Sequence, residues 1–328
     1  MGIKPIVVLM VGLAFASVHL AAAQQHEKIP KIGWLGARPA TPGSGTGIEL
    51  FLREFHTLGY VEGKNIVIEY RYADNKLDRL PALADELVRL KVDVLVTPGT
   101  NEALAAKNAT RTIPVVFLSV VDPVGVGLVD SLARLGENIT GFTIIAAVLA
   151  GKRLELLKET IPKLSRVAVL WNPQDPGPAE QWKESQLSAR ELGLQLHSME
   201  INSADKLESA FKETTKVRAA ALAVTQSAWA NSNQKQIADL ATKNRLPAIY
   251  PRGDFVASGG LMSYGADQTE PFRRGASMVD KILKGRKPAE IPVEQPTKFE
   301  FIINLKAAKQ IGLTIPPNVL VRADKVIK

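Results

Sequence analysis

Polar and aromatic side chains follow several short β-branched runs of this sequence, at places where strands are predicted to end. Six such loops hold hydroxyls, free backbone N–H groups, aromatic rings and the two carboxylates Asp122 and Asp267. In open parallel sheets, ligands bind beyond the carboxyl ends of the strands and close to helix N-termini. This mixture of groups suits a small polar zwitterion. The candidate ligand-binding residues are Arg38, Thr97, Gly99, Thr100, Ser119, Asp122, Trp171, Asn172, Thr225, Gln226, Tyr250, Tyr264 and Asp267.

The sequence gives little support for cofactor binding, metal binding or catalysis. The stretch Gly43–Gly47 has Ile48 where a dinucleotide-binding G-x-G-x-x-G motif needs its last glycine, and no G-x-x-x-x-G-K-[ST] motif occurs. The four histidines have no partners at metal-ligand spacing, and neither His56 nor His197 holds a loop position suited to a catalytic triad. We therefore expect no cofactor, no metal and no enzymatic activity, although Asp122 and Asp267 could form an acid–base pair.

The cysteine content and the distribution of charge argue against further classes of site and of partner. The chain has no cysteine, so disulfides, zinc–thiolate sites and thiol nucleophiles are impossible. The formal net charge of the 328 residues is +8. The basic residues stand among acids, as in 152–159 and 280–287, which is typical of solvated helix faces. We expect no binding to nucleic acid.

Residues 1–23 have the pattern of a secretory signal peptide. Lys4 precedes an apolar run from Ile6 to Val18, and Ala21–Ala23 provide small residues at a cleavage site. The run is short for a membrane span of about 20 residues, although an uncleaved anchor is the alternative. No lipid-acceptor cysteine follows, so we expect a protein that is cleaved near Ala23, soluble and periplasmic. Loss of Lys4 leaves 40 basic against 33 acidic residues, or +7.

The rest of the chain alternates strand and helix patterns. Short β-branched runs alternate with amphipathic runs of 10–15 residues, which predicts βαβ units on parallel sheets. This alternation occurs in two separate parts of the chain, which predicts two lobes. The expected strands are 31–35, 66–70, 92–96, 115–118, 166–170, 195–201, 219–224, 248–250 and 261–264. The expected helices lie around 51–58, 80–90, 101–110, 179–192, 207–211 and 234–244.

Long stretches of the sequence resemble one protein family. They are 58–96, 113–117, 122–142, 151–173, 246–250, 259–267 and 280–317. The chain resembles the tryptophan/tyrosine-type substrate-binding proteins of ABC transporters. It departs from the usual family pattern at 97–101, 119–123 and 225–229, where the ligand is expected.

The resemblance implies the type I periplasmic-binding-protein fold, an α/β fold with two doubly wound parallel-sheet lobes joined by a three-segment hinge. The crossings are expected near Ile144–Gly151, Gly265–Glu270 and Ile291–Lys298. The N-terminal lobe would then comprise 28–147 with 270–291, and the C-terminal lobe 148–269 with 292–328.

The implied function is that of a monomeric solute-binding component of an ABC importer. It would close around a small zwitterionic or carboxylate ligand, an amino acid or an aromatic amino-acid-like molecule, and deliver it to an ABC permease in the inner membrane. Thr100 is expected to bind the ligand carboxylate at a helix N-terminus, where the dipole adds about 0.3–1 kcal/mol. Asp122 or Asp267 would bind the ammonium, and Trp171, Tyr250 or Tyr264 would flank the apolar part. A helix cap at Thr100 and ordinary packing of the aromatics are the alternatives. A ligand sensor that serves a chemoreceptor or sensor kinase is the alternative function.

Overall fold

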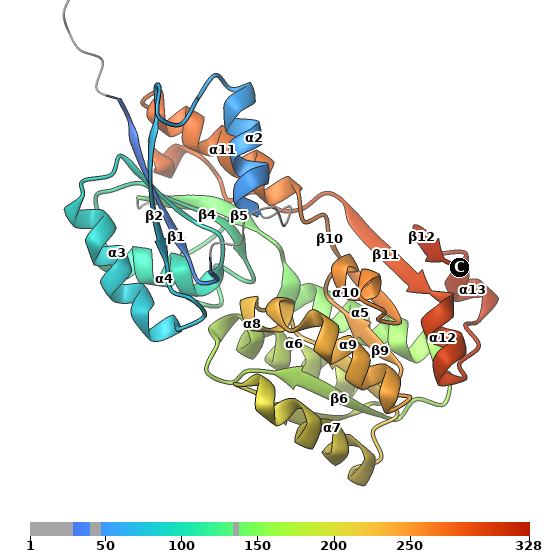
Figure 1. Ribbon diagram of the computed structural model, residues 1–328. Coiled ribbons are helices and arrows are strands. Elements are labelled where there is room, and N and C mark those ends of the chain that lie inside the picture. The colour runs from blue at the N-terminus through green and yellow to red at the C-terminus, as the bar shows by residue number, and fades with distance from the viewer. Residues whose placement is uncertain (1–28, 40–46, 134–137) are drawn as a thin grey trace, which may run out of the picture.

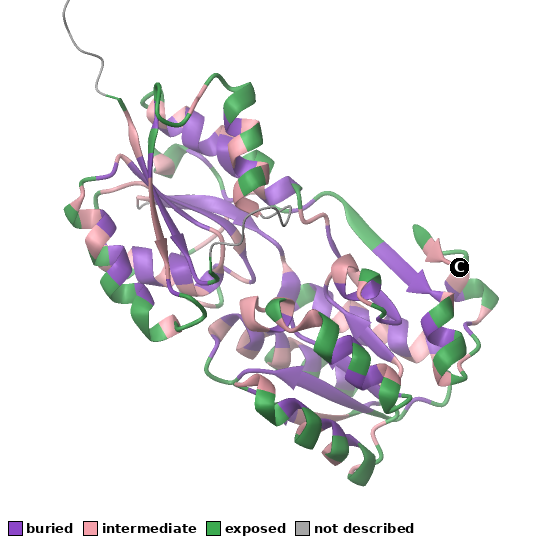
Figure 2. Ribbon diagram, viewed as in Figure 1, coloured by how far each residue is buried: buried purple, intermediate pink, exposed green. Residues whose placement is uncertain are grey.

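The computed structural model describes residues 29–39, 47–133 and 138–328, so the expected signal peptide and most of Gly43–Gly47 lie outside the described residues. The described chain forms two α/β lobes, each built on one sheet (Figure 1). We call the lobe with the five-stranded sheet the first lobe and the lobe with the seven-stranded sheet the second lobe. Buried strands between partly exposed helices give each lobe its core (Figure 2). None of the described helices is long and apolar enough to cross a lipid bilayer.

The first lobe holds a wholly parallel sheet in the order β2-β1-β3-β4-β5. Its strands are β1 (Lys31–Gly36), β2 (Val67–Tyr72), β3 (Val94–Thr97), β4 (Val115–Val120) and β5 (Ile139–Thr143). Helices α2 (Gly47–Thr57) and α11 (Glu270–Leu283) cover one face, and α3 (Leu80–Arg89) and α4 (Thr100–Ala109) cover the other. A short 3-10 turn, η1 (Leu77–Arg79), precedes α3.

Helix α11 returns to the first lobe after the chain has built most of the second. It packs on α2, β4 and β5. The contact is close because Gly275 has no side chain: a Cβ there would lie 2.1 Å from Cδ2 of the buried Leu118. The first lobe is therefore made from two segments that lie far apart in the sequence.

The second lobe holds a mixed sheet in the order β12-β11-β10-β9-β8-β6-β7, in which only the β10–β11 pair is antiparallel. Its strands are β6 (Arg166–Trp171), β7 (Gln195–Glu200), β8 (Ala221–Val224), β9 (Ala248–Tyr250), β10 (Met262–Ala266), β11 (Phe299–Asn304) and β12 (Lys325–Ile327). Its helices are α5 (Ala146–Thr160), α6 (Pro176–Leu192), α7 (Leu207–Lys216), α8 (Ala228–Ser232), α9 (Gln234–Lys243), α10 (Gly253–Ala257), α12 (Leu305–Ile311) and α13 (Pro317–Leu320). The 3-10 turn η2 (Ala204–Lys206) precedes α7, and the 3-10 turn η3 (Pro288–Glu290) follows α11.

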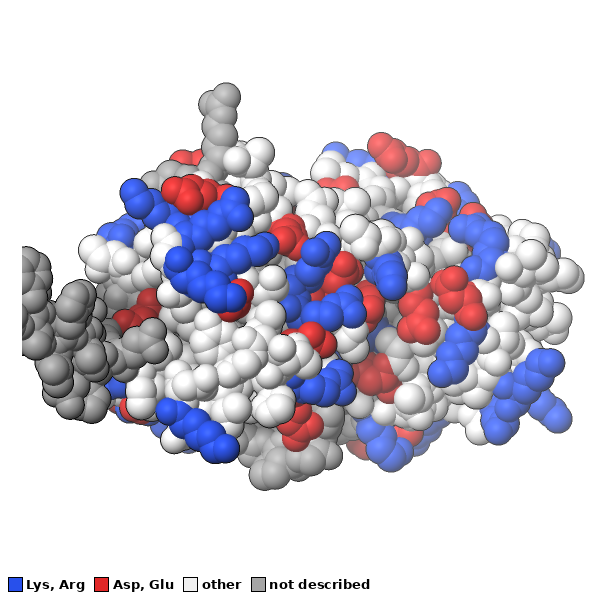
Figure 3. Space-filling model, turned by 90° about the horizontal axis from the view of Figure 1, so that it is seen from above, with Lys and Arg blue, Asp and Glu red and all other residues white. Residues whose placement is uncertain are grey.

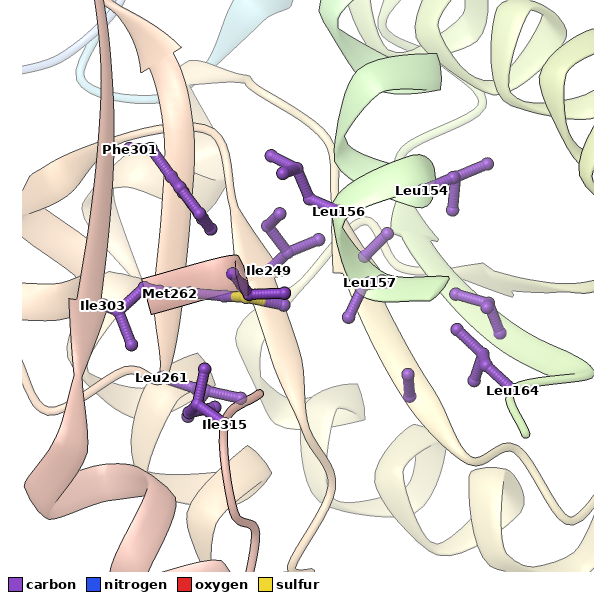
Figure 4. Packing of buried hydrophobic residues seen from close by; sticks show 14 of the residues in the cluster. Leu154, Leu156, Leu157, Leu164, Ile249, Leu261, Met262, Phe301, Ile303 and Ile315 are labelled. Carbon is purple, nitrogen blue, oxygen red and sulfur yellow. The ribbon is translucent and has the colours of Figure 1, made fainter. Parts of the chain in front are cut away.

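Apolar residues of α5 form much of the second core. Leu156 and Leu157 point toward Ile249 and Met262 of the sheet, and Phe301 and Ile315 close the cluster from the C-terminal segment (Figure 4). The C-terminal segment thus supplies two strands and part of the core to this lobe.

The chain passes between the sheets at three places. It leaves β5 for α5 at Ile144–Ile145, leaves β10 for α11 at Asp267–Thr269, and returns to β11 through 291–298. The last segment pairs with both neighbours: Thr143 N–H donates to Glu294 O at 2.9 Å, and Asp267 N–H donates to Lys298 O at 3.1 Å. These hydrogen bonds hold the three segments side by side.

The expected fold class is confirmed, and most of the expected elements are found with shifted ends. Helix α2 ends at Thr57, before Leu58, which is 40% exposed. Helix α6 starts at Pro176, three residues earlier than expected, because Asp175 caps it. Strands β5, β11 and β12 were not among the expected strands. The antiparallel β11 is a departure from purely parallel sheets.

Replacing Gly275 by valine should destabilise the first lobe. The added side chain meets the buried Leu118, and overpacking of this kind costs about 1–3 kcal/mol. Urea unfolding of Gly275→Val would measure the loss. The matched control is Arg273→Val, which places the same side chain on an exposed turn of α11 and should change the free energy of unfolding by less than about 0.5 kcal/mol. Equal effects of both variants would contradict this account of the packing.

Candidate functional site

A cavity of about 590 Å³ lies where the carboxyl ends of strands from both sheets meet. The size is within the range of about 300–1,000 Å³ that small-molecule sites occupy. The first lobe lines it with residues that follow β1, β3 and β4, namely Ala37, Arg38, Pro98, Gly99, Thr100 and Val121. The second lobe lines it with residues that follow β6, β8, β9 and β10, namely Asp175, Gly177, Gln226, Ser227, Asn231, Arg252 and Gln268.

Two helices, α4 and α6, begin at this cavity and touch each other across the lobes. Asn101 Nδ2 in the first turn of α4 donates to Asp175 Oδ1, the N-cap of α6, at 3.1 Å. A Cβ on Gly177 would lie 3.0 Å from Val121 Cγ2 and 3.5 Å from Thr100 Oγ1. Because helix N-termini attract negative charge, this junction favours an anionic group of a ligand or an acidic side chain.

The carboxylate of Glu102 lies buried at the first turn of α4. Its Oε1 accepts the Ala37 N–H at 3.0 Å, and this bond ties α4 to the end of β1. Burial raises the pKa of Glu102 to about 7, with a further contribution from the charge of Asp175, although the Ala37 hydrogen bond opposes the shift. Near neutral pH this group is therefore poised between its neutral and its charged form.

Asp175 is the second buried acid of the site. Its Oδ1 accepts the Gly177 N–H at 3.3 Å as well as the Asn101 amide. Burial raises the pKa of Asp175 to about 6, against the effect of these two hydrogen bonds. The cavity thus holds two carboxyl groups, one from each lobe, whose charged forms become more favourable when a cation enters.

The first lobe adds an aromatic wall. Trp34, Tyr70, Tyr72 and Phe272 line the cavity together with Ile48 and Leu52 of α2. Tyr70 and Tyr72 share one face of β2 because they are two residues apart, and their rings lie 6.2 Å apart at an angle of 5°. A ring of the ligand would meet aromatic faces here.

Two arginines and an amide complete the polar lining. Arg252 is held by Asp254, with Nη2 2.7 Å from Oδ2, whereas Arg38 is exposed at the cavity. The Oδ1 atom of Asn231 is buried and has no hydrogen-bond partner among the described residues. A ligand donor would satisfy this oxygen. No group of three or more His, Asp or Glu side chains in the described ranges is arranged to hold a metal ion.

The structure brings five of the candidate residues to the cavity: Arg38, Gly99, Thr100, Ser119 and Gln226. Their roles in binding stay predictions. Thr100 also has a structural role, because its Oγ1 accepts the Val121 N–H at 3.3 Å.

Eight candidates lie outside the cavity lining. Both carboxylates serve local turns: Asp122 Oδ1 accepts the Gly125 N–H, and Asp267 Oδ1 accepts the Thr269 N–H. The aromatics pack elsewhere: Trp171 stacks on Trp182, the fully buried Tyr250 on Phe255, and Tyr264 packs beside Phe301. The buried residues Thr97, Asn172 and Thr225 stand at strand ends, where Thr225 Oγ1 donates to Leu170 O.

Neither the two buried acids nor the residues of the aromatic wall were among the candidates predicted from the sequence. Glu102 follows Thr100 by two residues, and an acid in the first turn of a helix beside a binding loop is a signal that was present. Tyr70 and Tyr72 alternate on a strand, but β2 is an edge strand, and only the fold shows which of its faces meets the cavity.

Comparison with known proteins gives a family match over most of the chain. The family described as ABC transporter substrate binding protein matches residues 46–327. A curated relative, the tyrosine-binding protein of Clostridioides difficile (strain R20291), is 27% identical over 263 residues, which are 80% of this chain and 75% of that protein.

Solved structures of similar proteins share the fold. A conserved domain protein from Vibrio cholerae superposes with a TM-score of 0.85 at 28% identity, covering 91% of this chain and all of that one. An ABC domain from Streptococcus pneumoniae, in complex with L-Trp, gives 0.79 at 25% identity, covering 90% of this chain and all of that one. The ligand-free, open structure of a substrate binding protein with adhesive properties from Clostridium difficile gives 0.67 at 25% identity, covering 92% and 99%.

The raised pKa of Glu102 predicts a pH-dependent stability. The folded protein binds a proton that the unfolded chain releases above its ordinary value of 4.5, so Glu102 makes the free energy of unfolding fall as pH rises from about 4.5 through about 7. Glu102→Gln should remove about 2 kcal/mol of this dependence. Urea unfolding of the ligand-free protein at pH 5 and pH 8 measures it.

The matched control for this prediction is Glu208→Gln, which changes an exposed carboxylate in the same way. It should leave the pH profile as in the wild type. A Glu102→Gln profile parallel to the wild-type profile would contradict the prediction.

Proposed function

Because this chain belongs to the ABC transporter substrate binding protein family and is the solute-binding component of an importer, we propose that its cavity holds an aromatic amino acid, tryptophan or tyrosine. The observation that carries the proposal is one cavity in which an aromatic wall of the first lobe stands beside two buried acids, one from each lobe. A wall of this kind suits a ring, and the acids suit an ammonium group. The relatives named for tyrosine binding and seen with L-Trp support the same ligand class.

Each part of the ligand has a complementary group. The ammonium would lie near Glu102 and Asp175, and its charge would drive both carboxyl groups to their ionised form. The carboxylate would meet Arg38 and the N-terminus of α4 at Thr100. The ring would lie against Tyr72 and Phe272.

Binding would favour closure of the lobes. A ligand shifts an open–closed equilibrium only by its difference in affinity for the two states. A ligand that touches both Glu102 of the first lobe and Asp175 of the second has such a difference. The closed form would then dock on the permease and release the amino acid unchanged.

We propose that the mature protein acts in the periplasm as a monomer after removal of residues 1–23. The charge distribution supports a role without nucleic acid: on the face in Figure 3, Lys and Arg lie among Asp and Glu. Native mass spectrometry of the exported protein would give its N-terminus and its oligomeric state. A mature chain that retains residues 1–23, or a stable dimer, would contradict this part of the proposal.

A ligand panel tests the function. The purified protein is titrated with the common amino acids and with indole and phenol carboxylic acids that lack the amine, with thermal unfolding and calorimetry as readouts. L-Tryptophan or L-tyrosine should raise the melting temperature most, and the acids without the amine should bind at least tenfold more weakly. Mass spectrometry of the recovered ligand should show it unchanged. Binding only of aliphatic or acidic amino acids would overturn the proposal.

The aromatic wall predicts a specific loss. Tyr72→Ala removes a ring face, worth about 0.5–1.5 kcal/mol beyond its buried area, and should weaken binding of the aromatic amino acid about tenfold. Tyr60→Ala is the control, since Tyr60 stacks on Phe55 of the same lobe but does not line the cavity. It should lower stability and leave the dissociation constant within twofold. Calorimetry on both variants measures the two dissociation constants.

A further inference from the structure

Arg153 is a buried cation in the middle of α5. The residue is 2% exposed, and its hydrogen-bond acceptors among the described residues are all uncharged. A buried charge is costly unless hydrogen bonds satisfy it. Burial lowers the pKa of Arg153 to about 10, which leaves the guanidinium charged at neutral pH. Its environment must therefore supply acceptors in fixed positions.

The guanidinium donates to acceptors on three elements. Nη2 donates to Ala146 O at 3.1 Å and to Gln181 Oε1 at 3.2 Å, and Nη1 donates to Tyr264 O at 3.3 Å. Ala146 begins α5 directly after the first passage between the lobes, and Tyr264 lies on β10 just before the second. One side chain thus connects residues that lie next to two of the three segments that join the lobes.

The third acceptor leads to the cavity. Gln181 is fully buried on α6 and pairs with both backbone groups of Gln226: its Nε2 donates to Gln226 O at 2.9 Å, and its Oε1 accepts the Gln226 N–H at 2.8 Å. Arginine can only donate, so its bond to Oε1 fixes which end of the Gln181 amide faces it. Without Arg153, Gln181 Oε1 loses one of its two donors, and the amide is held only by its pairing with Gln226 and by the bond from Nε2 to Gly177 O at 3.3 Å.

The junction next to Ala146 is strained. Ile145 has φ +43° and ψ +33°, a left-handed conformation that β-branched residues rarely adopt. Its N–H donates to Thr143 Oγ1 at 3.2 Å, and the next carbonyl is the one that Arg153 holds. The contacts of Arg153 and Thr143 therefore fix the backbone on both sides of this residue.

We propose that Arg153 is a positioning residue that couples lobe closure to the shape of the cavity lining at Gln226. It holds the start of α5 at Ala146 and the middle of β10 at Tyr264, and through Gln181 it holds Gln226 at the cavity. It does not touch the ligand. The inference rests on the proposed function for its affinity readout, but the geometry of the Gln226 loop is measured without ligand.

The test compares Arg153→Met and Arg153→Lys with the wild type. Both variants should bind L-tryptophan or L-tyrosine at least tenfold more weakly, because a lysine ammonium lacks the planar fork that reaches three acceptors. In ligand-free hydrogen exchange, the Gln226 amide and residues 145–149 should lose protection in both variants. Leu164→Ala, a core variant in the connection between α5 and β6, is the control: it should lower stability with the dissociation constant and Gln226 protection within twofold of the wild type.

A double-variant comparison shows whether Arg153 acts through Gln181. Arg153→Met combined with Gln181→Leu should bind within twofold of Gln181→Leu alone. Losses that multiply, or unchanged exchange at Gln226, would overturn the inference. A wild-type protein that binds neither amino acid would overturn the proposed ligand, and the exchange data would still decide the role of Arg153.

Discussion

The parallel direction of the strands is the constraint on which the site depends. All five strands of the first sheet and the block from β6 to β10 in the second run with their carboxyl ends toward the gap between the lobes. Loops that follow strands of both sheets therefore open into one cavity without any long insertion. The antiparallel β11 lies beyond β10 and leaves this arrangement intact, because it forms the outer part of the second sheet.

The chemistry of the cavity follows from the burial of charge. Glu102 and Asp175 lie at the starts of two helices that face each other, so favourable helix dipoles and unfavourable desolvation act on the same groups. Desolvation dominates, and both pKa values rise. A site that holds two partly protonated acids is prepared for a cationic group. The aromatic wall adds selection for the shape of the ligand's ring at the end of the cavity away from the two acids.

Sequence periodicity predicted the elements well because strand and helix patterns are local. The alternation in 31–264 was enough for the α/β class, and four of the loops chosen for chemistry do reach the cavity, through residues such as Arg38 and Gln226. The aromatic residues could not be chosen from the pattern. Whether Tyr250 faces ligand or core depends on Phe255 and on the helices packed against β9, and these contacts are set by tertiary structure. Asp175 lies three residues after the candidate Asn172, and it reaches the cavity because α6 starts early, at Pro176.

The discontinuous first lobe has a consequence for how the molecule is made. Strands β1 to β5 are complete by residue 143, but the helix that covers β4 and β5 ends at residue 283. During synthesis, the face that holds Leu118 lacks its α11 cover until most of the second lobe has emerged. Neither half can reach its native state from one continuous stretch of polypeptide, so the two halves mature together and late. Chaperones that shield apolar surface would be needed most in that interval.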